Sequence, residues 1–446
     1  MKLTEKQIEH YKRHIIIPEV GEDGQIKLLY STAVVYCENT DSLRPLVYYL
    51  AALGIGKIFC YIDERSGADS LFSEVVDLNN DTSIDFLIEK NCTADYRIIL
   101  GNFNYVKKVA ERLSNEKFIP TIVSINGQWK GTLETFDNFK LFGEFINDLN
   151  KASNNGEICS AFLANAFSAA LCSIEAAKLC LNIGNLQKDM LFYDLFKMEF
   201  TKSEGSINVY ELLNDTNNGI NKDISKAKVL IVGTGGLGSP AAYGMAMAGI
   251  GTLGLLDLDK VEVSNLNRQV LHSFSRIGMP KVKSAEFLLK KFNPNINIKT
   301  YITELTKDNA EEIFSEYHFI IAAVDNILTR YLINDTCFLL NKPYAEAGIL
   351  RFDGTATTII PLQGHCYRCL YPNVDIKSLA SMGNGVLGPV PGVMGFIQAA
   401  EAMKYITGHG TTLKNKILLF DSLDIDFNII EIFKNPDCPI CGERQG

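Results

Sequence analysis

The stretch LIVGTGGLGSPAAYGMAMAGIGTLGLLDLD, residues 230–259, decides the fold of this chain. An apolar run leads into a glycine-rich turn, a segment of small residues follows, and a second apolar run ends on Asp257. Glycines let backbone N–H groups approach phosphates, and the start of the following helix adds positive potential. A carboxylate at the end of the second strand suits ribose hydroxyls. The stretch therefore predicts a nucleotide-binding α/β unit.

A second stretch, VVYCENTDSLRPLVYYLAALGIGKIFCYID at residues 34–63, repeats this pattern without the glycine-rich turn. Pro45 falls on Pro240, an offset of 195 (240 − 45). At this offset the four glycines of the turn fall on Glu38, Thr40, Asp41 and Leu43, and Asp257 falls on Ile62. The chain therefore carries one intact loop and one copy that has lost its glycines.

The repeat continues along the chain. Residues 94–104 resemble 316–326 at an offset of 222, residues 119–133 resemble 342–356, and the apolar segment 156–184 resembles 388–410. Each half alternates strands and helices, which predicts two α/β domains. We expect a first domain at 1–213, a polar linker at 214–226 and a second domain at 227–446. Because the offset grows by 27 (222 − 195), the first half lacks a segment that matches VSNLNRQVLHSFSRIGMPKVKSAEF.

Composition narrows the class of protein. The 446 residues are 47% hydrophobic and 21% charged, with a net charge of −9, as in an ordinary globular protein. This charge favours neither nucleic acid nor an anionic membrane as a partner. The N-terminus shows no signal peptide, and we expect no membrane span. Most of the eleven cysteines are scattered singly in apolar runs, which favours a reducing cytoplasm.

The segment missing from the first half carries the charged groups of the predicted site. By the glycine loop and Asp257 alone, an NAD-dependent dehydrogenase is favoured. A guanidinium and an ammonium nearby instead suit a triphosphate, and a carboxylate at the end of a later strand suits Mg²⁺. The side chains in question are Asn265, Arg268, Gln269, Lys281 and, for the metal, Asp325.

Two C-x-x-C pairs frame the last part of the chain. They are Cys366 with Cys369 and Cys438 with Cys441. Four thiolates in two such pairs predict a closed, tetrahedral, structural Zn²⁺ site that pins the C-terminus to the second domain.

These motifs occur together in one known group of enzymes. VGTGGLGSP, LLDLDKVEVSNLNRQVLH, GMPKV, VDN, CYRC, GVLGPVPGVMG and CPICG resemble, in order and spacing, the ThiF/MoeB/HesA adenylyltransferases, relatives of the ubiquitin-activating enzymes. The resemblance covers about residues 220–446. It implies that ATP adenylates the C-terminal carboxylate of a small ubiquitin-like protein or of a peptide, with release of pyrophosphate.

The resemblance also implies a role for each residue. The loop glycines are Gly233, Gly235, Gly236 and Gly238, and the ribose carboxylate is Asp257. Asn265, Arg268, Gln269 and Lys281 meet the phosphates, and Asp325 holds Mg²⁺. Relatives that form a thioester or persulfide carry a cysteine where this chain has Ser381. The expected product is therefore the acyl-adenylate, passed to a separate sulfur donor or amine.

The first half lacks these groups. Phe103 falls on Asp325, no C-x-x-C occurs, and the first half is predicted to be a pseudo-enzyme. Its opening segment still resembles the family segment whose arginine reaches the partner's ATP in a homodimer, with Arg13 at that arginine and His14 in place of a glutamine. We therefore expect two Rossmann-like domains that form a pseudo-dimer within one chain, packed through the small-residue segments of the repeat. The protein is then a monomeric pseudo-dimer or a homodimer, and Arg13 acts within its chain or across chains.

Three functions stay open at this point. The favoured one is adenylation of a ubiquitin-like sulfur carrier. The second is the same chemistry on a ribosomal peptide in natural-product maturation. The third, a scaffold or a dehydrogenase, fits the full set of charged residues less well.

Overall fold

The computed structural model describes residues 2–87, 93–151, 162–203, 209, 213, 224–372 and 385–442. The predicted linker lies mostly outside these residues, so the domain boundaries stay a prediction. Three short helices open the chain: α1 (Glu5–His10), α2 (Lys12–Ile15) and α3 (Gly21–Tyr30).

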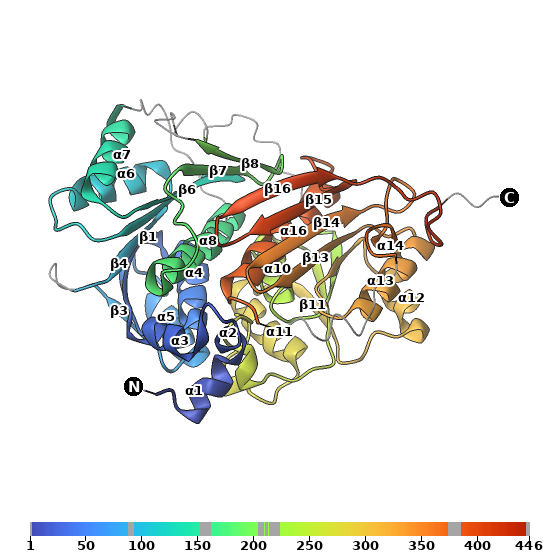
Figure 1. Cartoon of the computed structure of the whole chain (residues 1–446). Helices are drawn as coiled ribbons and strands as arrows, with labels where there is room; N and C mark the ends of the chain where they lie inside the picture. Colours follow the sequence, from blue (N-terminus) through green and yellow to red (C-terminus); the bar gives the residue numbers. More distant parts are fainter. Residues whose placement is uncertain are drawn as a thin grey trace.

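Two eight-stranded mixed sheets with the same strand order follow (Figure 1). The first runs β3-β2-β1-β4-β5-β6-β7-β8 and the second β11-β10-β9-β12-β13-β14-β15-β16. In both, the first five strands are parallel and the last three are antiparallel to their neighbours. The predicted fold of two tandem Rossmann-like domains is confirmed.

The elements of the first half are β1 (Thr32–Asn39), α4 (Thr40–Leu53), β2 (Lys57–Glu64), α5 (Ala68–Leu78), β3 (Ser83–Phe86), β4 (Tyr96–Gly101), α6 (Phe103–Leu113), β5 (Thr121–Ile125), β6 (Lys130–Phe136), α7 (Phe139–Lys151), α8 (Phe162–Leu181), β7 (Met190–Asp194) and β8 (Glu199–Ser203). Those of the second half are β9 (Lys228–Val232), α10 (Gly238–Met247), β10 (Thr252–Leu256), η1 (Val263–Asn265), η2 (Phe274–Arg276), α11 (Lys281–Phe292), β11 (Asn297–Tyr301), α12 (Lys307–Ser315), β12 (Phe319–Ala322), α13 (Ile327–Leu339), β13 (Tyr344–Leu350), β14 (Asp353–Ile359), α14 (Tyr367–Leu370), α16 (Pro389–Thr407), β15 (Lys416–Asp421) and β16 (Asp426–Glu431).

The two halves share one core. Helices α4 and α8 of the first half and α10 and α16 of the second lie between the sheets, where α8 packs against α4 and α16, and α10 against α16 (Figure 1). The predicted contact between the two small-residue helices is thus confirmed. By length and composition α8 is also apolar enough to cross a membrane, but nearly all of it is buried in this core.

Repeated contacts relate the halves by a pseudo-twofold axis. Asn185 N–H donates to the carbonyl of Leu423 (3.0 Å), and at the matching place Thr411 N–H donates to the carbonyl of Phe196 (2.8 Å). Phe200 of β8 stacks on Phe427 of β16, with ring centroids 4.1 Å apart. Phe200 and Phe427 occupy the same position in their own sheets, so a residue meets its own counterpart, as in an isologous dimer.

Candidate functional site

The glycine loop lies between β9 and α10, at the carboxyl end of the central strand of the second sheet. Gly233 has φ of +92°, and a Cβ on it would lie 2.5 Å from the carbonyl oxygen of Ala323. A Cβ on Gly238 would lie 1.9 Å from the carbonyl oxygen of Gly233. Packing therefore demands glycine at both positions.

Gly235 and Gly236 are glycines for another reason. The nearest atom to a Cβ on Gly235 would be the amide nitrogen of Gln269, at 3.5 Å. A Cβ on Gly236 would meet Pro391 at 3.2 Å and Arg268 at 3.7 Å. Both positions therefore face Arg268 or Gln269 closely, and a side chain on Gly236 would be crowded by Pro391. Helix α10 also begins with no side-chain cap, and such a start suits an anion.

Asp257 and His272 hold the loop in shape. One carboxylate oxygen of Asp257 accepts the N–H and the hydroxyl of Thr234, at 2.7 and 2.9 Å. The buried His272 lies with Nε2 3.0 Å from the Thr234 carbonyl oxygen and Nδ1 3.0 Å from the hydroxyl of Ser284. Burial lowers the pKa of His272 to about 3, so the ring is neutral. Since a carbonyl only accepts, Nε2 carries the proton.

The predicted phosphate-binding residues come together beside this loop. Arg268 donates to the Ser264 carbonyl and to the side chain of Asn267, both at 2.8 Å. Gln269 is buried, and its side-chain oxygen has no hydrogen-bond partner among the described residues. The side-chain oxygen of buried Asn265 accepts the Glu262 N–H (3.1 Å). The half-buried guanidinium of Arg268 beside the glycine loop fits a polyanionic ligand, whereas the unpaired side-chain oxygen of Gln269 calls for a hydrogen-bond donor such as a hydroxyl.

Lys281 begins α11 and lies on the Asp257 side of the site. Its Nζ lies 2.8 Å from Oδ2 of Asp259. The lysine side chain is 8% exposed and that of Asp259 68% exposed, so the ammonium is held in place by a carboxylate that faces solvent.

Asp325 is exposed just beyond β12, near Arg268. Burial and the charge of Arg13 lower the pKa of Arg268 to about 10, against the effect of Asp325. Arg330 of α13 donates twice to the carbonyl of Val324 (3.1 and 2.9 Å) and fixes the backbone before Asp325. A solvent-facing carboxylate on a fixed backbone fits a partly hydrated Mg²⁺.

Arg13 of the first half is the last member of this group. Its carbonyl accepts the Val386 N–H (3.0 Å), just before α16. Arg13 also lies close enough to Arg268 for its charge to lower the Arg268 pKa. Among the described residues of one chain, Arg13 and Asp325 therefore both lie close enough to Arg268 for their charges to act on it.

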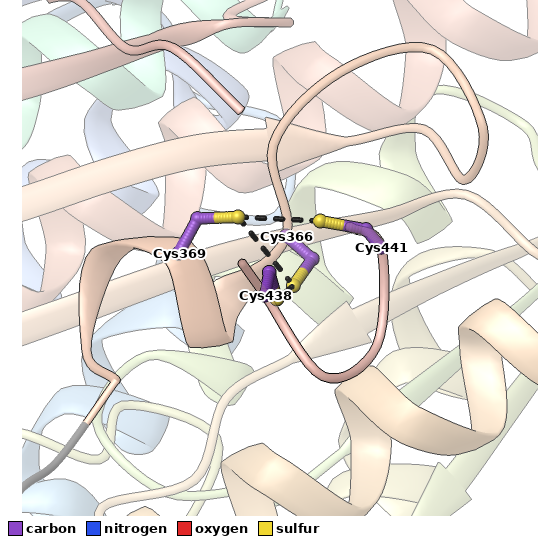
Figure 2. A group of neighbouring side chains, drawn as sticks. All are labelled: Cys366, Cys369, Cys438 and Cys441. Carbon is purple, nitrogen blue, oxygen red and sulfur yellow. Dashed lines mark hydrogen bonds between the residues drawn. The ribbon is translucent and has the colours of Figure 1, made fainter. Parts of the chain in front are cut away.

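The four predicted zinc ligands form one cluster (Figure 2). All four sulfur atoms lie within 4.8 Å of one another. Cys366 Sγ lies 3.4 Å from Cys438 Sγ, and Cys369 Sγ lies 3.2 Å from Cys441 Sγ, so each C-x-x-C pair faces the other. Four converging thiols suit a tetrahedral zinc ion.

The same place in the first half is built differently. Strand β1 continues to Asn39, and α4 follows it directly without a glycine turn. Strand β2 continues to Glu64. Asn39 caps α4 by accepting the Ser42 N–H (2.9 Å). Farther in, Asn126, Asn165, Ser168 and Tyr193 hydrogen-bond to one another. The Asn39 cap thus takes an N–H at the start of α4, the kind of donor that a phosphate would need.

The match of Phe103 to Asp325 falls in a loop whose length differs between the halves. The pairing of β4 with β1 and of β12 with β9 keeps the offset of 222 up to this loop. The helices after it do not, since Asn102 caps α6 and Asn326 caps α13, an offset of 224 (326 − 102). The loop of the first half is thus two residues shorter. Ser381 lies outside the described residues.

Sequence reasoning missed His272 and Arg330. His272 holds the backbone of Thr234 in the glycine loop, and Arg330 holds the backbone of Val324 just before Asp325. A lone histidine in the apolar run VLHSF gave no signal for such a role.

Comparison with known proteins agrees with this geometry. The model of the ThiF family matches residues 207–440. The chain is 42% identical over 224 residues to an adenylyltransferase and sulfurtransferase MOCS3 of Culex quinquefasciatus, covering 50% of this chain and 51% of that one. It is 40% identical over 230 residues to the sulfur carrier protein adenylyltransferase of Thermus thermophilus, covering 50% and 84%. It is 40% identical over 221 residues to the SAMP-activating enzyme E1 of Haloferax volcanii, covering 49% and 81%. The chain thus spans about half the length of the MOCS3 relative.

Proposed function

The chain belongs to the ThiF family, and we propose that it adenylates the C-terminal carboxylate of a small ubiquitin-like sulfur carrier with ATP. The observation that carries this proposal is the convergence of the glycine loop, Arg268, Lys281 and Asp325 at one end of the second sheet. Relatives named for sulfur carrier and SAMP activation support the kind of partner.

In the proposed reaction a carboxylate oxygen of the carrier attacks the α-phosphorus of ATP. A P–O bond forms, the bond to the bridging oxygen breaks, and pyrophosphate leaves with its electron pair. Since a carboxylate is a weak nucleophile, the protein contributes alignment and neutralisation of the charge that develops. Gly235, Gly236 and the start of α10 offer N–H groups to the phosphates, and Asp257 lies at the ribose.

The cations of the site have separate tasks in this proposal. Arg268 and Lys281 neutralise the triphosphate, with Asn265 and Gln269 as amide partners. Mg²⁺ held by Asp325 would supply further positive charge at the departing pyrophosphate. Arg13 of the first half completes the site as an arginine finger, and we take the first half to be a pseudo-enzyme without a nucleotide site among its described residues.

The acyl-adenylate is the proposed endpoint on this enzyme. Among the described cysteines of the second half, Cys337 is buried and its pKa is raised by burial, and the other four form the metal cluster. None of these offers an exposed thiolate for a thioester. A separate sulfur donor or amine then takes the acyl group. The four-cysteine cluster holds a structural zinc, and we place the reaction in the cytoplasm.

ATP–pyrophosphate exchange tests the proposal. The full-length protein is given MgATP, labelled pyrophosphate and, in separate reactions, ubiquitin-fold proteins that end in Gly-Gly. We expect label in ATP only with an acceptor whose C-terminus is free, and none when that C-terminus is amidated. Exchange with short peptides but with no carrier would favour the peptide substrate instead. MgATP binding without exchange for any acceptor would contradict the proposal.

A further inference from the structure

The segment that carries Arg13 is fastened to the second half of the chain at three points. The Arg13 carbonyl accepts the Val386 N–H (3.0 Å), and Gly388 N–H donates to Nε2 of His14 (3.1 Å). Glu19 forms an ion pair with Arg351, in the turn between β13 and β14. Arg351 in turn donates its N–H to the Gly385 carbonyl (3.0 Å). The residues leading into α16 are therefore held between the β13–β14 turn and the segment of Arg13.

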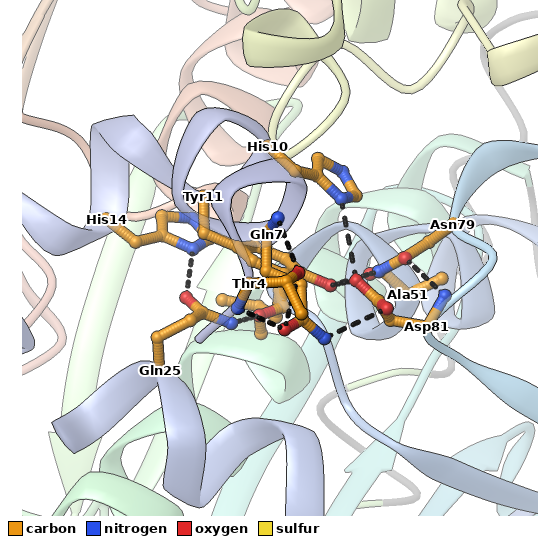
Figure 3. Close-up of polar contacts among 10 residues, drawn as sticks. Thr4, Gln7, His10, Tyr11, His14, Gln25, Ala51, Asn79 and Asp81 are labelled. Atoms are coloured by element: carbon orange, nitrogen blue, oxygen red, sulfur yellow. Dashed lines mark hydrogen bonds and ion pairs between the residues drawn. The ribbon is translucent and has the colours of Figure 1, made fainter. Parts of the chain in front are cut away.

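His14 is the buried member of these attachments. Figure 3 shows its ring facing the side chain of Gln25. Because Gly388 N–H is a donor, Nε2 of His14 must accept, and Nδ1 carries the proton. Nδ1 then donates to the side-chain oxygen of Gln25 (3.0 Å), and the Gln25 amide donates to the Leu53 carbonyl (2.9 Å). The chain of hydrogen bonds runs from the end of α4 in the first half to the start of α16 in the second.

One end of this chain of hydrogen bonds is Gly388, and the other end, Leu53, is followed by Gly54. A Cβ on Gly388 would lie 2.3 Å from the carbonyl oxygen of Asn267 and 3.3 Å from Nε2 of His14. Gly54 has φ of +88°, and a Cβ on it would lie 2.7 Å from the Gln25 amide nitrogen. These close approaches leave the His14 ring little freedom. They also bring it near Asn267, which accepts a hydrogen bond from Arg268.

We infer that His14 is a positioning residue, which holds Arg13 beside Arg268 before ATP arrives. Two guanidinium groups repel each other until a polyanion lies between them. The backbone of Arg13 must therefore be held from both sides, and the hydrogen bonds of Arg13 and His14 to Val386 and Gly388 do this. This inference rests on the proposed role of Arg13.

His10 offers a matched control on the same segment. It is as buried as His14, stacks on Tyr11 and contacts Phe274 edge-on. Neither of its ring nitrogens has a hydrogen-bond partner among the described residues. Nδ1 lies 4.0 Å from Asp81, but burial lowers the pKa of His10 to about 3, so no ion pair forms at neutral pH. Loss of its ring removes packing without removing a bond to the second half.

Hydrogen exchange on the full-length protein tests the position of His14 without any acceptor. In His14→Ala we expect the amides of Val386 and Gly388 to exchange at least about tenfold faster, because a buried bond is lost. His14→Gln should restore much of the protection, since its amide oxygen can accept the Gly388 N–H. His10→Ala should leave these two amides as in the wild type. Unchanged exchange in His14→Ala, at a melting temperature like that of His10→Ala, would overturn the inference.

Kinetics then test whether His14 acts through Arg13. In pyrophosphate exchange, His14→Ala should lower kcat about tenfold to hundredfold, with little change in KM for ATP. In an Arg13→Ala background, His14→Ala should cause no further loss. Fully additive losses would show a general structural role and contradict the inference. If the wild type shows no exchange with any acceptor, the proposed function fails, while the amide exchange still decides the position of His14.

Discussion

The two halves of this chain have the same scaffold and differ at the carboxyl ends of their central strands. Each half buries a glutamate–lysine pair on its interface helix: Glu175 with Lys178 at 2.6 Å in α8, and Glu401 with Lys404 at 2.5 Å in α16. In each half the same glutamate accepts a threonine hydroxyl, from Thr135 in β6 or Thr358 in β14. It also accepts one backbone N–H from the loop before β7 or β15.

A buried charge needs partners, and both halves supply the same ones. The buried glutamate–lysine pair is present in both halves, whereas only the second half has the glycine loop. The pair therefore serves packing rather than chemistry. The groups found only in the second half, from the glycine loop to Asp325, are those that we propose bind the substrates. The comparison thus separates structural from functional residues within one molecule.

The largest effect is expected when the carboxylate after a strand of the second half is removed, and not when a carboxylate at a strand end of the first half is removed. Asp325→Ala should abolish carrier-dependent pyrophosphate exchange, at least about a thousandfold, because the charge of the triphosphate loses its metal partner. Asp63→Ala removes an exposed partner of Lys108 at the end of β2 and should change the rate little. Normal exchange by Asp325→Ala would show that the site is misassigned.

The next effect tests the contribution of the first half. Arg13→Ala should slow adenylation about a thousandfold, the lower end for arginine fingers in nucleotide hydrolases, with little change in melting temperature. Lys12, its exposed neighbour, lies 3.9 Å from Glu9, and Lys12→Ala should be neutral. Equal rates for the two variants would remove the first half from the catalytic site.

Metal content is expected to differ between the halves as well. Elemental analysis should find one zinc per chain. Cys438→Ser should lose the zinc and destabilise the second half by several kcal/mol, since zinc binding in small peptides contributes roughly 10–16 kcal/mol. Cys60→Ala, at a buried thiol of the first half, should keep the zinc. A stable wild type without metal would contradict the assignment.

The glutamate–lysine pairs should behave alike in both halves. Glu175→Gln and Glu401→Gln each leave a buried ammonium without its counter-charge, and each should cost about 3–5 kcal/mol in the free energy of unfolding. Urea unfolding measures both. A large loss for Glu401→Gln with none for Glu175→Gln would mean that the pair has a role in the second half alone.

The last expected effect concerns acid. Burial lowers the pKa of His14 to about 4 and the pKa of His10 and His272 to about 3. Above pH 6.5 these rings are neutral in both states. Below it the unfolded chain binds protons that the folded chain cannot, so stability falls as the pH drops toward 3–4. Each ring lowers the free energy of unfolding by up to about 1.4 kcal/mol for each unit that the pH falls in this range.

Urea unfolding of His10→Phe tests the acid effect, because the variant keeps an aromatic ring that cannot titrate. Its stability should fall less steeply between pH 6.5 and 4 than that of the wild type. A matched variant at the exposed His409 should follow the wild type. An unchanged slope in His10→Phe would contradict the lowered pKa.

Much of this architecture could be predicted from the sequence because the repeat itself carries it. Proline and glycine matches 195 positions apart predicted two copies of one sheet, and the family motifs named the residues around the loop. The rest depended on tertiary contacts. A gapless match of Phe103 to Asp325 did not show that the loop before α6 is shorter than the loop before α13. The bonds of His14 and His272 join segments distant in sequence, and Glu175 and Glu401 gave no sign of their buried partners.

Complementation between two inactive variants tests the central claim, that one chain builds one complete site from both halves. Arg13→Ala and Asp325→Ala chains, with different affinity tags, are produced together and assayed by pyrophosphate exchange. If Arg13 serves the site of its own chain, the mixture should be as inactive as either variant alone. Recovery of a substantial part of wild-type exchange, on complexes that carry both tags, would show that the finger is delivered between chains and would contradict the account.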